Sequence, residues 1–474
     1  MPVPRLPLAV PLALLTASLL AACVAGPDYV RPTIDVPAAY KENGAWKTAE
    51  PQPADTRAPW WEAYRDPILN GLMTDAEGAN QNLRLAEAQY RQAKALADSA
   101  RAGLYPTLGA NAGAGRGLTN NSGVIREGDT YSLGLSASWV PDLWGSVRRS
   151  IEAGNANAQA SADDLAGVHL SIQTALAQDY LQLRISDQLR VLYSATIEAY
   201  TRALKLTRAQ HAAGVALLSD VALAETQLAS AQATAVDLDA SRAQLEHAIA
   251  ILTGRAPAQF ALAPVAADAA LAIELPATPI GLPSALLERR PDIAAAERRA
   301  ALANANIGVA RAAYYPNLVL NAGGGFSAAT VGALFDTPSR VWSLGATLAQ
   351  TLFDGGLRRA HDAQAVAAYD AAVAQYKQTV LAGFQQVEDN LSTLTVLDRE
   401  AAYQAQAVKS AQTAERLALT QYRAGTATYL AVVTAQTLSL TNQRTAVQLR
   451  GRQLAASVGL ITATGGGWQV ASAN

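Results

Sequence analysis

One residue has a setting that points to a defined covalent chemistry, and it is the single cysteine of the chain, Cys23. It directly follows an uncharged apolar stretch from Leu6 to Ala22, which is preceded by Arg5. A charged start, an apolar middle and small residues at the end are typical of an export signal. An uncleaved anchor helix is the alternative, but about 17 residues is the short limit for crossing a bilayer.

The four residues Leu20-Ala21-Ala22-Cys23 closely match the lipobox of bacterial lipoproteins. We therefore expect residues 1–22 to be removed, diacylglycerol to be attached to the Cys23 sulfur, and the new amino group to be acylated. Val24 follows instead of aspartate, which favours delivery to the outer membrane. Each buried methylene adds about 0.8 kcal/mol, so several acyl chains anchor stably. Residues 23–59, rich in proline, are expected to form a tether.

Other chemistry has no candidate residues. The four histidines, which are His169, His211, His247 and His361, lie far apart without the spacing of zinc ligands. No nucleophile elbow or phosphate loop occurs, so we expect no catalytic residue, no metal and no cofactor beyond the lipid on Cys23. The net charge of −2 argues against a nucleic-acid partner.

An internal repeat organises the rest of the chain. Ala100 to Pro106 returns as Ala310 to Pro316, 210 positions later, and Gly145 with its two arginines returns at Gly355 with the same offset. Repeats of this kind mark a duplicated structural unit. We assign the copies to residues 60–254 and 284–460, with a proline-rich crossover at 255–283 and a flexible tail at 461–474.

Each copy contains a short pair of strands. Alternating apolar and small or polar residues predict β-hairpins at about 107–141 and 317–353, and this pattern fits a sandwich or a membrane barrel. Trp139, Trp144 and Trp342 are expected at the membrane interface rather than in simple packing. Four strands cannot close a membrane barrel, which needs about eight, so several copies must share one barrel if these strands enter the bilayer.

Long helices follow the strands. No proline interrupts the predicted helices at about 147–212 and 357–423, each roughly 100 Å long, and both carry an apolar stripe near the helical period. Gly214 and Gly425 allow tight reversals into return helices at about 219–253 and 429–458. A further helix is expected from Pro67 to about Gly103, and its counterpart from 291 to about 314.

Several short motifs accompany these features: Trp60-Trp61-x-x-Tyr64-x-Asp66-Pro67, both Tyr-Pro hairpins, Leu287-Glu-Arg-Arg-Pro-Asp292, and Tyr422-Arg-Ala-Gly425 with Tyr429-Leu430 and Ala435-Gln436. Together with the lipobox, their order resembles the outer membrane factor family, in its lipoprotein, NodT-like or OprM-like branch of TolC-type efflux channels. The resemblance implies an α+β membrane protein that is internally duplicated. It implies a homotrimer with a twelve-stranded β-barrel, a long periplasmic helical barrel and a mixed equatorial domain. It also implies a periplasmic adaptor and an inner-membrane RND-type pump as partners.

The resemblance also places a periplasmic gate at two tips, 209–221 and 421–434. Family members often have aspartate before the Ala-Gln pair of the second tip, where this chain has Thr434. Asp220, Arg423, Tyr429 and Thr434 are the gate candidates. Asp220 is as readily a capping residue at a helix start. Arg423 and Arg208 either pair with acidic groups or are ordinary cations at a helix end, and we favour the helix-end role.

These features predict a passive outer-membrane exit duct of a multidrug efflux pump. An ABC exporter for protein secretion could use the same duct, and a lipid-anchored helical scaffold without a pore is a third reading.

Overall fold

The computed structural model describes residues 24–42, 59–121, 124–264, 273, 275–276 and 289–466. Cys23, the export signal and much of the crossover and tail lie outside these residues. The chain divides into two compact units. The first, here called the strand unit, contains 1–34, 88–162 and 295–378, and the second, the hairpin unit, contains 35–87, 163–294 and 379–474. Each unit draws on both repeats, so repeat boundaries and compact units do not coincide.

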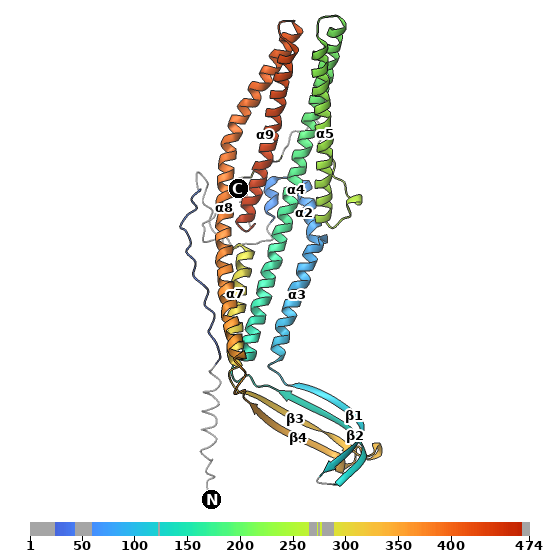
Figure 1. Cartoon of the computed structure of the whole chain (residues 1–474), viewed down its shortest axis with the longest axis vertical. Helices are drawn as coiled ribbons and strands as arrows, with labels where there is room; N and C mark the ends of the chain where they lie inside the picture. The colour runs from blue at the N-terminus through green and yellow to red at the C-terminus, as the bar shows by residue number, and fades with distance from the viewer. Residues whose placement is uncertain are drawn as a thin grey trace, which may run out of the picture. The chain divides into compact units, whose positions relative to one another are not determined.

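The strand unit contains one antiparallel sheet with the order β1-β2-β3-β4 (Figure 1). Its strands are β1 (Thr107–Asn121), β2 (Val124–Trp139), β3 (Asn317–Ala328) and β4 (Arg340–Ala349). Each repeat supplies one hairpin, and β2 of the first pairs with β3 of the second. Within this sheet β1 and β4 are the edges.

Four helices pass from one unit into the other: α3 (Gln81–Ala102), α4 (Ser146–Ala212), α7 (Pro291–Ala312) and α8 (Leu357–Arg423). An aspartate before α4 and another before α8 accept hydrogen bonds from free N–H groups of the first turn, as Asp142 does from Val147 and Asp354 from Arg358. The predicted limits of α4 and α8 agree with the structure to within one residue. None of the helices in the described ranges has a segment long and apolar enough to cross a membrane.

Two helix predictions need correction. The helix expected from Pro67 to about Gly103 is divided at Asn80 into α2 (Pro67–Ala79) and α3. The Asn80 side chain accepts from the N–H groups of Asn82 and Leu83, which starts a new helix. The return helices are α5 (Leu218–Leu252) and α9 (Tyr429–Ala463), so the tail predicted from residue 461 begins too early. Leu460 and Ile461 are buried, and their packing extends α9.

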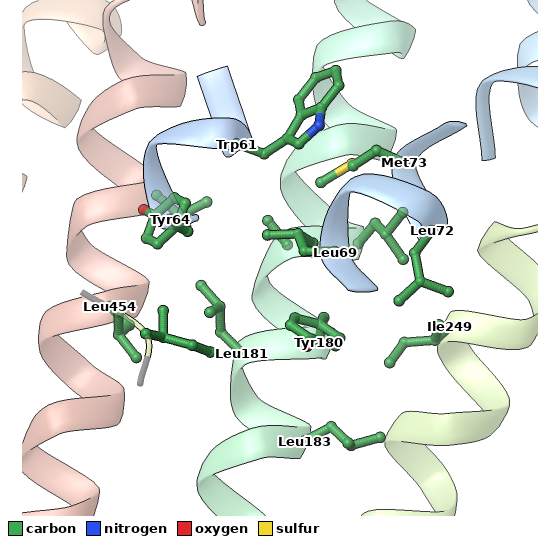
Figure 2. Close-up of a cluster of buried hydrophobic side chains, with 14 of the residues drawn as sticks. Trp61, Tyr64, Leu69, Leu72, Met73, Tyr180, Leu181, Leu183, Ile249 and Leu454 are labelled. Atoms are coloured by element: carbon green, nitrogen blue, oxygen red, sulfur yellow. The ribbon is translucent and has the colours of Figure 1, made fainter. Parts of the chain in front are cut away.

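The core of the hairpin unit surrounds the middle of α4 (Figure 2). Tyr64, Leu69, Met73, Tyr180 and Leu183 are each no more than 1% exposed, and Ile249 and Leu454 close the cluster from α5 and α9. Ionic contacts hold the start of the crossover beside it. Arg242 contacts fully buried Asp187 at 2.7 Å and donates to the Leu262 carbonyl at 2.6 Å.

Candidate membrane, anchor and gate surfaces

The sheet has one apolar face. Residues opposite each other in an antiparallel pair point to the same side. The register therefore gathers large apolar side chains, which remain exposed in the single chain, on one face. Its pairs include Leu108 with Ala137, Leu133 with Phe326, Ala322 with Leu344, and Leu318 with Leu348. An exposed apolar face of this extent is typical of strands that contact lipid.

The opposite face is polar and uncharged over residues 107–117 and 128–138 and along β3 and β4. Over these residues the face carries glycine, serine, threonine and asparagine, with Val319, Val341 and Ala349 as the only larger or apolar additions. Charges occur on the other face, at the strand ends farthest from the helices, where Arg116 pairs with Glu127 at 3.1 Å. Water-filled barrels have a polar inner face of this kind.

Two of the three candidate interface tryptophans fasten the junctions between strands and helices. Trp139 donates to the Leu104 carbonyl at 3.0 Å, and Trp144 donates to the Pro316 carbonyl at 2.7 Å. Trp342 lies elsewhere, because its partner on β3 is four positions beyond the partner of Trp139, or about 13 Å along the strand. It is 83% exposed on the apolar face. Their role at a membrane interface stays a prediction.

The segment after Cys23 is attached at the same junction. The Ala25 N–H donates to the Trp144 carbonyl at 3.0 Å. Arg149, whose side chain is 5% exposed, donates to the Ala25 carbonyl at 3.2 Å and to Asp28 at 2.8 Å. The structure thus holds the chain immediately after the predicted lipid site beside the base of the sheet, while Cys23 itself lies outside the described residues.

Close backbone contact fixes the course of this tether. Gly26 has a φ of +89°, and a Cβ atom there would lie 2.5 Å from the Gly308 Cα, so both positions require glycine. Further along, the Tyr29 hydroxyl donates to Glu297 at 2.6 Å. Burial, and then the bond to Glu297, raise the pKa of Tyr29 above its ordinary range. The tether is therefore a packed part of the strand unit.

The two tips of the hairpin unit have the same turn. Gly214 and Gly425 adopt φ values of +74° and +71°, as predicted for reversal residues. In both turns the residue after the glycine donates to the carbonyl five positions back, which closes a Schellman motif. Asp220 then accepts from the Leu217 N–H at 3.2 Å, so the structure gives it the capping role.

Tyr429 joins the two hairpins. Its side chain is 2% exposed and packs with Leu204 and Val221 of the first hairpin, and its ring lies 5.2 Å from that of Tyr422. Burial is the main cause that raises the pKa of Tyr429 to about 12, and Asp220 contributes through its nearby charge. Tyr429 is therefore a neutral packing residue at physiological pH, and the cluster holds the tips together within one chain.

The remaining gate candidates are exposed. The Thr434 hydroxyl donates to the Leu430 carbonyl of its own helix at 2.9 Å. Arg423, in the last turn of α8, has no ion pair among the described residues, which agrees with a helix-end cation. Arg208 instead forms an ion pair with Glu225 of α5, at 2.6 Å. A gate role for any of these residues stays a prediction.

The buried polar groups around the gate candidates were not predicted from the sequence. The Tyr422 hydroxyl and the side-chain oxygens of Gln227 and Gln436 are buried without a hydrogen-bond partner in the described structure. Gln227 also lines a cavity of about 350 Å³ between α5 and α9, together with Tyr200 and Arg444. One signal was available: tyrosines bracket Gly425, whereas His211 and Leu218 occupy the equivalent positions around Gly214.

Comparisons with known proteins identify the family of the chain. The family model described as outer membrane efflux protein matches residues 72–255 and 282–466, one match for each repeat. The pyoverdine export outer membrane protein OpmQ of Pseudomonas aeruginosa is 34% identical over 461 residues, covering 95% of both chains. The toluene efflux pump outer membrane protein TtgC of Pseudomonas putida is 30% identical, covering 96% of this chain and 94% of that protein.

Solved structures show the same fold. The outer-membrane channel OprN superimposes with a TM-score of 0.87 at 30% identity, covering 94% of this chain and all of that chain. VceC of Vibrio cholerae gives a TM-score of 0.79 at 29% identity, covering 88% of this chain. The chain therefore belongs to the outer membrane efflux protein family, and it is a duplicated, TolC-like outer-membrane efflux channel protein rather than an enzyme.

Proposed function

We propose that this chain is the lipid-anchored, trimeric exit duct through which a tripartite pump expels small toxic compounds. The observation that carries the proposal is the two-sided sheet, with large apolar side chains on one face and uncharged polar residues on the other. Such a sheet can contact lipid with its apolar face and water with its polar face, but the unpaired backbone groups of its two edge strands must be hydrogen-bonded. Three copies supply twelve strands, which is sufficient for a membrane barrel.

The polar face favours small molecules of varied charge. Since its glycine, serine, threonine and asparagine side chains carry no charge, it offers no strong electrostatic selection of solutes. The named relatives act in export of pyoverdine and efflux of toluene, compounds of different chemistry. From these relatives we infer only that the substrates of this chain are chemically varied.

Energy and gating come from partners. We propose an inner-membrane RND-type pump and a periplasmic adaptor that binds the separated hairpin tips better than the packed ones. An adaptor shifts this equilibrium only by its difference in affinity for the two states. The tyrosine cluster of Tyr422 and Tyr429 is the contact that must loosen within each chain.

Lipid on Cys23 completes the proposal. The residues that directly follow Cys23 are held beside the base of the sheet, so acyl chains on Cys23 would start close to the face of the sheet that contacts lipid in this proposal. Metabolic labelling with an alkyne fatty acid tests this directly. Label is expected on the wild-type chain and absent from Cys23→Ala, and equal labelling of both would refute lipidation at Cys23.

Deletion of the gene, followed by susceptibility tests over a compound panel, tests the efflux role. Lost resistance to several compounds, restored by the wild-type gene, is the expected result. Unchanged resistance to every compound together with loss of a secreted protein would instead favour the ABC exporter. The purified protein should conduct ions in planar bilayers, and a trimer without conductance would favour the scaffold.

A further inference from the structure

The cavity between the two helical hairpins has the size and the lining of a small-molecule site. It lies between α5 of the first hairpin and α9 of the second (Figure 1), and its volume is about 350 Å³. Pockets that hold small molecules have volumes of roughly 300–1,000 Å³. Along α9 the lining extends to Arg444, about four helical turns from the start of this helix at Tyr429. The cavity is therefore separate from the turns at Gly214 and Gly425.

One face of each helix forms a wall of the cavity. The lining residues of each wall follow one another four and then three positions apart, so they lie on one side of their helix. They include Leu223, Gln227 and Ser230 on α5, and Val433, Thr437 and Leu440 on α9. The walls are in direct contact, because Nε2 of Gln227 donates to the Val433 carbonyl at 3.3 Å. Since the walls belong to different hairpins, the cavity is complete only while the hairpins are packed together.

Two buried tyrosines of α4, Tyr193 and Tyr200, complete the lining. They form a cluster with buried Ala231 of α5, and Leu440 of α9 packs against it. Burial, and then the nearby charge of Glu415, raise the pKa of Tyr200 to about 12, so its hydroxyl is neutral at physiological pH. This part of the cavity offers an uncharged, aromatic and aliphatic surface to the body of a ligand.

The charge of the cavity comes from a single arginine. Arg444 is the one charged residue of the lining, it is exposed, and it makes no hydrogen bond or ion pair with another described residue. Arg452 of the same helix, by contrast, pairs with Glu400 at 3.4 Å. Hydroxyl groups add further donors to the lining, at Ser230, Thr437 and Thr441. Guanidinium and hydroxyl donors beside an apolar surface suit a carboxylate that is attached to an apolar body.

We propose that this cavity is a regulatory site, which binds small amphipathic carboxylates and thereby holds the two hairpins together. The apolar body of the ligand lies against the tyrosines and Leu440, and its carboxylate accepts hydrogen bonds from Arg444. Because the ligand contacts both walls only when the hairpins are packed, its binding shifts the equilibrium toward packed tips. Binding at the cavity does not depend on the channel role, whereas its effect on opening rests on the proposed function.

Binding is tested on the full-length protein with para-trifluoromethylbenzoate, by the broadening of its fluorine NMR signal in a titration. The neutral amide of the same acid, para-trifluoromethylbenzamide, is the ligand control. The wild-type chain should bind the benzoate saturably and about tenfold more tightly than the benzamide, and Arg444→Gln should remove this difference. Thr441→Trp, which puts a large side chain into the cavity, should weaken the binding of both. Arg444 and Thr441 are exposed, so neither change disturbs a buried core residue.

Arg452→Gln is the matched control variant, because it removes a cation of α9 that is outside the lining. It should bind the benzoate like the wild-type chain. Equal binding of the benzoate to the wild-type chain, Arg444→Gln and Thr441→Trp would place the site elsewhere and overturn the proposal. The lack of saturable binding to the wild-type chain would also overturn it.

Hydrogen exchange of the tip peptides, 209–221 and 421–434, tests the regulatory role. A ligand that binds only packed hairpins should slow exchange through separated tips about tenfold at a concentration of ten times Kd, and only about twofold in Arg444→Gln at the same concentration. Unchanged tip exchange in the wild-type chain at saturating benzoate would overturn the regulatory role. Conductance of the ligand-free protein tests the proposed duct by a separate measurement, so the two failures are distinguishable.

Discussion

Replacing Tyr429 with alanine should loosen the two hairpins of one chain at their tips. Tyr429 is 2% exposed, and removal of a buried aromatic side chain costs about 3–5 kcal/mol. Because the side chain packs on Leu204 and Val221 across the hairpins, this cost falls on their contact. At about 1.4 kcal/mol per tenfold, the fraction of separated tips should rise by about two to four orders of magnitude. Tyr429→Phe, which keeps the ring, should cost only about 0.5–1.5 kcal/mol.

Hydrogen exchange of peptides from both tips measures the loosening, and planar-bilayer conductance measures its effect on the channel. Tyr403→Ala is the matched control, because Tyr403 lies on α8 of the same hairpin and is 80% exposed. Tip exchange and conductance should rise in the order Tyr403→Ala, Tyr429→Phe, Tyr429→Ala. Equal exchange for the two alanine variants would refute the packing argument. Faster tip exchange without added conductance would show that this contact is not the gate.

Three further outcomes follow from the tips. The pKa of Tyr429 is raised to about 12, so its hydroxyl is neutral in both packed and separated tips below pH 10. The fraction of separated tips, obtained from exchange relative to its base-catalysed intrinsic rate, should stay constant below pH 10 and rise from about pH 10 to 12. Tyr429→Phe should lack that rise. Alanine at Gly214 or Gly425 should cost about 1–2 kcal/mol at that tip, seen as faster exchange, because φ is positive while no atom blocks a Cβ; no change would contradict the backbone argument. Thr434→Asp should shift the reversal potential in a salt gradient toward cation selectivity, since Thr434 is exposed and uncharged, and an unchanged potential would place it away from the conducting path.

Local patterns were sufficient for the long helices. The absence of proline and the continuous apolar stripe predicted α8 at 357–423, as observed, and glycine predicted both reversals. The break at Asn80 was missed because its reason is partly distant in sequence. The Asn80 side chain donates to the Leu252 carbonyl, and Gly254 packs directly against Ala79. The apolar stripe of a helix reflects only the periodicity of that helix, so contacts with distant residues cannot be predicted from it.

The gate candidates show the same limit. Asp220 could be weighed as a capping residue because the Leu217 N–H it accepts from is three positions away. Tyr422 and Gln227 could not be assigned, because their surroundings come from the other hairpin. The pairing of Arg208 with Glu225 also depends on the helices meeting across a turn, not on helix-end electrostatics alone.

The two repeats differ in how an equivalent arginine is used. Arg149 and Arg359 occupy equivalent positions, yet only Arg149 receives the tether, whose carbonyls and Asp28 satisfy its buried guanidinium. The tether needs space, and Gly308 provides it. Arg359 is exposed, and the position equivalent to Gly308 is Asp98, which pairs with Arg101 at 3.1 Å. Gly308→Asp should therefore obstruct the tether, whereas Asp98→Gly at the equivalent position of α3 should leave the tether in place.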